Sequence, residues 1–242
     1  LSSAYFADYT YYEEEVWISP LGMSYPVVLM EWVEGDTLGV YLSRLLGNGL
    51  NSVDANVRLE GVYRKFLDLS GFLLGSDFAH GDLKHDNIIV TKEGELRLVD
   101  YDGMFVPALA GMSACELGGT AYQHPLRKSD FFDARLDDFS IFVISASLLA
   151  LSLYPSMYSA YNSKDNLLFS RSDYSNLSES VVIKQMYNIC DNRLNMLVDK
   201  IVSMISLAMP YSTNSLSLIS LLQMCSLMDN YYLKSIGSAT KV

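Results

Sequence analysis

Residues able to bind a metal-bound phosphate are concentrated in one stretch of the chain, His80–Gly103 (HGDLKHDNIIVTKEGELRLVDYDG). Carboxylates stand at Asp82 and Asp100, and the amide of Asn87 lies between them. Carboxylate and amide oxygens suit Mg²⁺, a hard cation that takes few protein ligands alongside phosphate oxygens. These residue types therefore predict metal-dependent chemistry on a phosphate group.

Two short apolar runs within this stretch predict the elements that position the polar side chains. Asn87–Val90 and Leu96–Val99 are typical of β-strands, and Thr91–Glu95 between them contains Lys-Glu-Gly, which is typical of a hairpin turn. A hairpin brings the start of its first strand beside the end of its second, so the two carboxylates and the amide would converge. The alternative is a solvated acidic hairpin, which gives no reason for the amide or for the spacing.

The segments HGDLKHDN and DYDG resemble the catalytic loop H-R-D-L-x-x-x-N and the metal-binding D-F-G of protein kinases. The spacing agrees, because Asn87 follows Asp82 by five positions and Asp100 follows Asn87 by thirteen. The resemblance implies that Asp82 is the catalytic base and that Asn87 and Asp100 bind Mg²⁺. It also implies that ATP is the phosphate donor and that Lys84 contacts the transferring γ-phosphate.

Three neighbouring residues receive further interpretations from the same resemblance. His80 would pack and hydrogen-bond behind the metal-binding turn. Asp102 takes the place of the motif's glycine and would either hold a metal ligand in position, the interpretation we favour, or bind the metal itself. Gly81 replaces the motif's arginine, the usual receiver of an activation-loop phosphate, so switching by that route is not expected.

Residues 1–33 predict β-structure, because aromatic and β-branched residues flank a Ser-Pro-Leu-Gly turn at Ser19–Gly22. The strands are expected in Ala4–Tyr12, Val16–Ile18 and Val27–Val33. The run VVLMEWVEGDTL resembles the last strand of a kinase N-lobe passing into the hinge.

This second resemblance implies a nucleotide site. Met30 would be the gatekeeper at the back of the adenine pocket, and the main chain of Glu31 and Val33 would bind the adenine edge. Asp36 or Thr37 would lie near the ribose. The alternative is an ordinary edge strand and loop, because hinges carry little side-chain signature.

A complete kinase has a Gly-rich loop, a strand lysine and a helix glutamate upstream of this point, and we find no match to them between Leu1 and the hinge. We therefore expect residues 1–35 to form only the end of an N-lobe and residues 36–242 to form a kinase-like C-lobe. The expected fold is α+β, a mainly helical C-lobe with a remnant of the β-rich N-lobe. The chain alone is expected to be weakly active or inactive.

Apolar periodicity predicts the main helices of the C-lobe. Thr37–Leu46, with Thr37 as N-cap, and Val53–Leu74 each carry an apolar face. Phe139–Tyr154 is apolar nearly all round but has only sixteen residues, short of the ~20 that cross a bilayer, so it predicts a buried core helix. Asp137 opens this helix in a D-x-W-S-like segment and is expected to cap it and to bind the catalytic-loop backbone.

The remaining segments are expected to be loops and C-terminal helices. Met104–Gly119 would be the activation segment, and GTAYQHP after it resembles the substrate-seating region of kinases, with Leu126 in place of the anchoring glutamate. His124 is expected to be a local hydrogen-bonding residue. Tyr158–Asn176 predicts a loop. Helices are expected at Glu179–Cys190, Arg193–Met209 and Asn214–Met228.

Composition limits the partners and the compartment. The chain has 242 residues, half of them hydrophobic, and a net charge of −11, which disfavours nucleic acid and anionic membranes. Cys115, Cys190 and Cys225 lack metal-ligand spacing and fit a reducing cytoplasm, each as a small buried hydrophobe. No signal peptide is expected, because no charged and apolar leader pattern follows Leu1.

Three functions follow from these patterns. The first, which we favour, is a Ser/Thr protein kinase resembling the bacterial eukaryotic-like kinases, with a protein hydroxyl as phosphate acceptor. The second is a small-molecule kinase of the aminoglycoside or choline type, against which Lys84, the YQHP segment and the Asp137 helix start all argue. The third is a pseudokinase or scaffold, favoured by the missing lysine and opposed by the presence of Asp82, Asn87 and Asp100 together.

Overall fold

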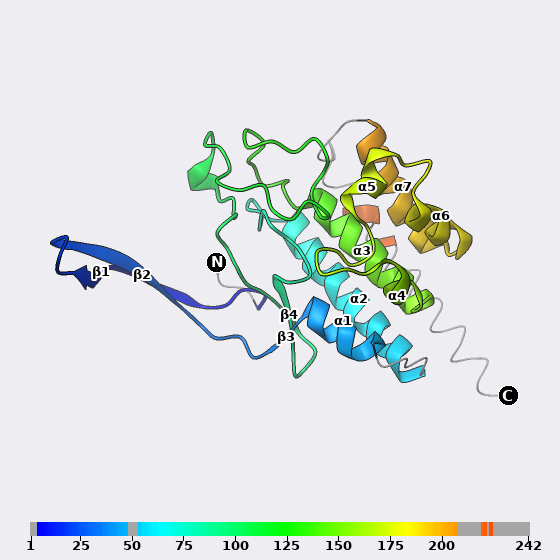
Figure 1. Cartoon of the computed structure of the whole chain (residues 1–242), viewed down its shortest axis with the longest axis horizontal. Coiled ribbons are helices and arrows are strands. Elements are labelled where there is room, and N and C mark those ends of the chain that lie inside the picture. Colours follow the sequence, from blue (N-terminus) through cyan, green and yellow to red (C-terminus); the bar gives the residue numbers. More distant parts are fainter. Residues whose placement is uncertain (1–3, 48–52, 208–218, 222, 225–242) are drawn as a thin grey trace.

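The computed structural model describes residues 4–47, 53–207, 219–221 and 223–224. The fold is α+β: a two-stranded ribbon and a three-stranded antiparallel sheet adjoin a body of helices. Figure 1 shows the ribbon reaching away from the helical body, with the small sheet at the junction between them.

The ribbon consists of β1 (Tyr9–Ile18) and β2 (Met23–Met30), joined by a turn in which Gly22 has a φ of 60°. Its strands confirm the β-structure predicted for this region but not the bounds: residues 9–18 form one strand, and residues 4–8 and 31–33 lie outside the strands. The register shifts between Tyr12 and Val16, where Glu13–Glu15 form a bulge. Every residue of β1 is exposed, so the ribbon packs little of its surface against the body.

The small sheet has the order β3-β4-β5 and contains the predicted hairpin. Strand β4 (Ile88–Thr91) pairs antiparallel with β5 (Leu96–Leu98), and β3 (Gly35–Thr37) pairs with the other edge of β4. Ile88, Val90, Leu96 and Leu98 are buried, because alternate residues of both strands point into the core. The sheet thus joins the end of the ribbon to the polar loop before β4.

Helices α1 (Leu38–Leu46) and α2 (Val53–Leu74) have the predicted bounds, except that Thr37 lies just before α1 as its cap. Thr37 is the N-cap of α1, and its Oγ1 accepts a hydrogen bond of 3.3 Å from the backbone N–H of Val40. The α2 residues at three- and four-residue steps, including Leu59, Val62, Tyr63 and Phe66, are buried.

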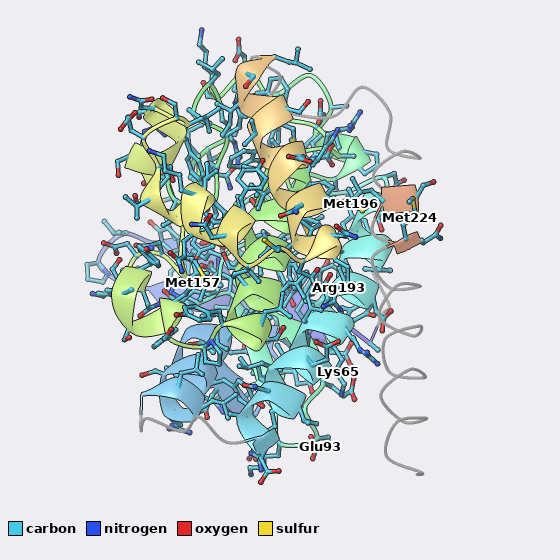
Figure 2. The ribbon with its side chains drawn as sticks, turned by 90° about the vertical axis from the view of Figure 1, so that its right-hand side faces the viewer. Lys65, Glu93, Met157, Arg193, Met196 and Met224 are labelled. Atoms are coloured by element: carbon cyan, nitrogen blue, oxygen red, sulfur yellow. The ribbon has the colours of Figure 1, made fainter. Side chains whose placement is uncertain are left out.

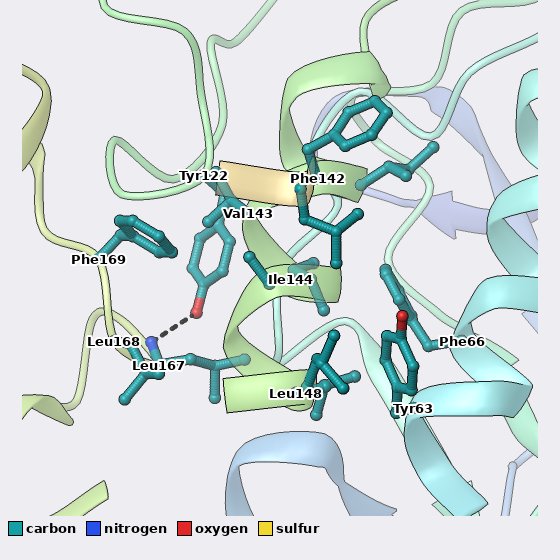
Figure 3. Close-up of a cluster of buried hydrophobic side chains, with 14 of the residues drawn as sticks. Tyr63, Phe66, Tyr122, Phe142, Val143, Ile144, Leu148, Leu167, Leu168 and Phe169 are labelled. Atoms are coloured by element: carbon teal, nitrogen blue, oxygen red, sulfur yellow. Dashed lines mark hydrogen bonds between the residues drawn. The ribbon is translucent and has the colours of Figure 1, made fainter. Parts of the chain in front are cut away.

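Helix α3 (Asp138–Leu153) is the centre of the core, as predicted for this apolar segment. Every residue from Asp138 to Ser152 is buried. Figure 3 shows Ile144 and Leu148 of α3 beside Tyr63 and Phe66 of α2. Among the described residues, no helix is long and apolar enough to cross a membrane.

The C-terminal part is more helical than predicted. Within the predicted loop Tyr158–Asn176 lie most of α4 (Met157–Tyr161) and all of α5 (Arg171–Ser175), so that prediction is wrong. Five-residue helices show too little periodicity to be recognised. However, Ser170 and Asp173 form a reciprocal capping box, a local signal for the start of α5.

Two longer helices complete the described body. They are α6 (Val181–Asn188) and α7 (Asn192–Ser206), each slightly shorter than predicted. Arg193 of α7, labelled in Figure 2, lies 3.8 Å from Glu60 of α2, an ion pair that joins the two helices. The third predicted helix, Asn214–Met228, falls largely outside the described residues.

The prediction that the cysteines are buried is wrong for the two that lie among the described residues. Cys115 and Cys190 are both exposed, because the loop after the sheet and the end of α6 leave them at the surface. Cys225 lies outside the described residues.

Candidate functional site

The ends of the β4–β5 hairpin bring the predicted polar residues together. The backbone N–H of Val99 donates to the carbonyl of Asn87 at 3.1 Å, which ties the start of β4 to the end of β5. Asn87 and Asp100 are therefore neighbours at one end of the sheet. Asn87 N–H donates to the carbonyl of Lys84 at 3.0 Å, which folds the loop Gly81–Asn87, hereafter the polar loop, over this end.

Asp82 accepts hydrogen bonds on both oxygens of its carboxylate, and only 5% of the residue's surface is exposed. Its Oδ2 accepts from Lys84 Nζ at 2.5 Å and from Asn87 Nδ2 at 3.2 Å. Its Oδ1 accepts the backbone N–H of Gly119 at 2.7 Å. The carboxylate is thus fixed on both oxygens while Oδ1 keeps a second lone pair for another donor.

Lys84 carries the positive charge of the site. Burial lowers its pKa, but the hydrogen bond to Asp82 and the charges of Asp82, Asp100 and Asp86 raise it above the usual value overall. The interaction with Asp100 places that carboxylate within electrostatic reach of Lys84. The site therefore combines the Lys84 cation, fixed on Asp82, with carboxylates from the polar loop and from the end of β5.

Asn87 and Asp100 offer oxygens that fit a hard cation. Asn87 Nδ2 also donates to the Asp82 carbonyl at 2.9 Å, which leaves Oδ1 without a hydrogen bond among the described residues. The side chain of Asp100 is exposed, and its backbone has a φ of 69°, unusual for a residue other than glycine. The described residues contain no group of three or more His, Cys, Asp or Glu able to hold a metal, so an ion here would need phosphate oxygens as well.

Asp137 holds the start of the polar loop. Its Oδ2 accepts the N–H of His80 at 2.6 Å and its Oδ1 accepts the N–H of Gly81 at 2.9 Å. The predicted contact with the polar-loop backbone is confirmed, whereas the predicted cap is only positional. Asp137 is the N-cap residue of α3, but its side chain makes no capping hydrogen bond to the helix. Complete burial raises the pKa of Asp137, an effect that His80 and these hydrogen bonds oppose.

His80 has the structural role predicted for it. Its ring is buried, and its Nε2 lies 3.0 Å from the carbonyl of Val99, to which it donates. It therefore links the polar loop to the end of β5, directly before Asp100.

Gly81 adopts a backbone conformation that excludes the arginine of the kinase motif. Its φ is 81°, and a Cβ at this position would lie 2.0 Å from the carbonyl oxygen of Gly103. The polar loop and the D-Y-D-G turn approach each other so closely that only glycine fits here.

The segment after the turn is anchored by residues that the sequence did not reveal. Arg127 Nη1 donates to the Gly81 carbonyl at 2.7 Å and to Gln123 Oε1 at 2.5 Å. Gln123 Nε2 also donates to the Gly81 carbonyl, at 3.3 Å. These contacts anchor the segment where Leu126 replaces the glutamate of the kinase pattern. Nothing in a single sequence marks such a long-range contact.

Gly118 and Gly119 bring this segment directly against Asp82. Besides the Gly119 hydrogen bond, a Cβ at Gly118 would lie 2.7 Å from Asp82 Oδ1. Gly118 has a φ of 73°, so it supplies both the turn and the close approach. His124 lies farther along the segment, where its Nδ1 accepts the N–H of Leu126 at 3.1 Å, confirming its local hydrogen-bonding role.

The predicted nucleotide-binding residues are less well assembled than the polar loop. The N–H of Glu31 already donates to the Asp8 carbonyl at 2.8 Å, whereas the main chain of Val33 makes no hydrogen bond to other described residues. Asp36 forms an ion pair with Arg44, and the hydroxyl of Thr37 caps α1. The side chains of Asp36 and Thr37 therefore already have hydrogen-bond partners, and neither is free to make the predicted contact with a ribose.

Met30 and Asp102 lie on a pocket beside the polar loop. Its volume is ≈ 470 Å³, and both residues line it. Asp102 thus faces an apolar pocket, and no hydrogen bond joins it to Asn87 or Asp100 among the described residues.

A scan against protein-family models finds no match, and a search of curated proteins finds no matching sequence.

Proposed function

We propose that this chain is an ATP-dependent phosphotransferase of the protein-kinase type, which transfers phosphate to a Ser or Thr hydroxyl of a protein. The observation that supports it best is the arrangement around Asp82. This carboxylate is held by Lys84, Asn87 and Gly119, at the end of the sheet where Asp100 also lies. A solvated acidic hairpin requires no such set of contacts.

The proposed chemistry assigns a separate task to each side chain. Asp82 Oδ1 keeps a free lone pair, with which it accepts the hydrogen bond of the acceptor hydroxyl and takes its proton late in the transfer. Lys84 stabilises negative charge on the transferring phosphoryl group. Asn87 Oδ1 and the Asp100 carboxylate would hold Mg²⁺, which when bound neutralises the charge of the triphosphate.

Hydrogen bonds from outside the polar loop hold its backbone in place and so position Asp82. Asp137 fixes the N–H groups of His80 and Gly81, and Arg127 fixes the carbonyl of Gly81. In-line transfer depends on holding the acceptor hydroxyl and the base within a narrow range of positions. These contacts hold the base at one end of the sheet.

A second candidate is a nucleotide-binding domain without catalysis. The covering of Asp82 by Gly118 and Gly119 favours it, because a protein hydroxyl must reach a carboxylate of which only 5% is exposed. In this alternative the segment from Gly103 to Gly119 stays closed over the base.

Phosphate transfer from labelled ATP to a generic protein acceptor, in the presence of Mg²⁺ and at high chain concentration, tests the proposal. We expect slow labelling of Ser and Thr that falls ~10²–10⁴-fold in Asp82→Asn, the range for loss of a positioned acid–base group. Asp54→Asn, on the exposed first turn of α2, is the matched control and should label as wild type. Labelling that is unchanged in Asp82→Asn contradicts the proposal, and Mg·ATP binding without labelling favours the second candidate.

A further inference from the structure

The β1–β2 ribbon presents a large apolar face to solvent. Tyr9 pairs with Met30 and Tyr11 pairs with Val28, so these four side chains share one face of the ribbon. Their exposed fractions are 57%, 37%, 58% and 55% in that order. A two-stranded ribbon is marginally stable in water by itself, and exposed apolar patches of this kind mark interaction sites.

This face continues into the pocket at the base of the ribbon. The same four residues form one wall of the pocket, whose volume is ≈ 470 Å³. That volume is within the ~300–1,000 Å³ typical of ligand sites. The opposite wall comes from the body and is also apolar, except for Asp102. It consists of Phe6, Tyr101, Asp102, Met104 and Val106.

The walls of the pocket are held in place by aromatic packing and hydrogen bonds. The Tyr101 hydroxyl donates to the Leu98 carbonyl at 2.5 Å and accepts the N–H of Ala7 at 2.8 Å. The rings of Phe6 and Tyr101 pack edge to face, with centroids 5.5 Å apart. The pocket is thus formed before anything binds in it.

Among the described residues, the unpaired charges around this face are negative; the nearby Arg97, whose charge acts on Tyr101, forms an ion pair with Glu31. Glu13–Glu15 form the bulge of β1, and neither they nor Asp102 form an ion pair with described residues. The first 43 residues of the sequence contain no Lys or Arg. A ligand for this surface should therefore be apolar and positively charged.

We propose that the ribbon face and its pocket bind a cationic, apolar segment of a partner protein. One apolar side chain of the partner fills the pocket, and Lys or Arg residues beside it pair with Asp102 and with Glu13–Glu15. A second copy of this chain fits poorly, because each copy carries a net charge of −11 and would bring the same glutamates together. The proposal does not depend on phosphate transfer.

The test uses a short synthetic peptide of alternating lysine and valine with a central tyrosine, and the same peptide with glutamate in place of lysine. Trp17 pairs with Ser24 on the same face, and the chain's other tryptophan is Trp32. In a Trp32→Phe background, fluorescence of Trp17 therefore reports binding directly. We expect the lysine peptide to bind, binding to weaken with added salt, and the glutamate peptide to bind at least about tenfold more weakly.

Matched variants locate the site. Tyr11→Ser, on the proposed face, should lower the affinity for the lysine peptide about tenfold or more. Asp102→Asn should have an effect of the same size. Tyr12→Ser removes the same side chain from the opposite face, where Tyr12 pairs with Val27, and should leave affinity within about twofold. Circular dichroism checks that each variant keeps the helical body.

Three results would overturn the proposal. The first is absence of binding by the lysine peptide, or equal binding of the two peptides. The second is an equal effect of Tyr11→Ser and Tyr12→Ser on affinity. The third is a Tyr11-dependent dimer in sedimentation velocity without peptide binding, which would assign the face to a second copy of the chain.

Discussion

At the scale of single residues, Gly81 shows how closely the polar loop and the D-Y-D-G turn approach each other. We expect Gly81→Ala to destabilise the fold by at least ~2 kcal/mol, because a Cβ would overlap the Gly103 carbonyl and the φ of 81° suits glycine alone. Gly61→Ala is the control. Gly61 lies inside α2 with open space around it, so its replacement should stabilise by ~0.5–1 kcal/mol. Urea unfolding of both variants measures the difference, and equal stability of the two would contradict this explanation.

The residues of the polar loop could be predicted because they lie close together in the sequence. Asp82, Asn87 and Asp100 surround a short hairpin, and the hairpin pattern was sufficient to bring them to one end of the sheet. Arg127 and Gly119 could not be predicted, because they reach the loop from about forty positions away and no local pattern records the contact. The ion pair between Asp36 and Arg44, which removes a predicted ribose contact, joins residues only eight positions apart and depends on how α1 turns back on β3.

At the scale of elements, α3 supports the polar loop through Asp137. We expect Asp137→Asn to lower the free energy of unfolding by ~1–3 kcal/mol, because the carboxamide replaces one of the two accepting oxygens with an NH₂ group and leaves the buried N–H of His80 or of Gly81 without an acceptor. Labelling activity should fall together with stability. Asp54→Asn again serves as the exposed control. Wild-type stability in Asp137→Asn would show that α3 does not hold the loop.

Element boundaries were predictable where an apolar period runs for two turns or more. The bounds of α2 and the burial of α3 follow from side-chain pattern alone, since a helix apolar on all sides must be enclosed. The five-residue helix α4 packs on α3 without a side-chain cap, and α5 has a capping box and packs on α3 through Tyr174. Helices this short show too little apolar periodicity to be told from loops.

At the scale of the whole molecule, two buried histidines make stability depend on pH. Burial lowers the pKa of His85 and of His124 below 6.5. With the ring neutral, His85 Nδ1 accepts the hydroxyl hydrogen of Tyr122, and the Tyr122 hydroxyl in turn accepts from the N–H of Leu167 (Figure 3).

Because these pKa values are depressed in the folded state, the unfolded state binds more protons below pH 6.5, and the histidines' contribution to stability is lost as the pH falls through the folded pKa. We expect the free energy of unfolding to drop between neutral pH and about pH 5. The drop should be smaller in His124→Gln, which removes one of the two groups. Urea unfolding across this range is the measurement, and an equal slope in the variant would rule out His124 as a source of the effect.

The arrangement of the whole chain also sets the expected affinity for nucleotide. The polar loop and Asp100 form one side of the proposed site, while the predicted hinge residues are exposed or engaged elsewhere, with Trp32 87% exposed. Formed pockets bury ~70–90% of a ligand, so a site open on one side should bind Mg·ATP only at high micromolar concentration or more weakly.

Calorimetric titration of ATP with and without Mg²⁺ tests the proposed phosphate site most directly, because it does not require turnover. The wild-type chain should bind ATP weakly and only with Mg²⁺. Asp100→Asn tolerates the left-handed backbone and should lose that binding, whereas Asp36→Asn, whose carboxylate already pairs with Arg44, should retain it. Binding that is independent of Mg²⁺ or unchanged in Asp100→Asn would contradict the assignment of Asp100, and no binding at millimolar ATP would contradict the proposed function.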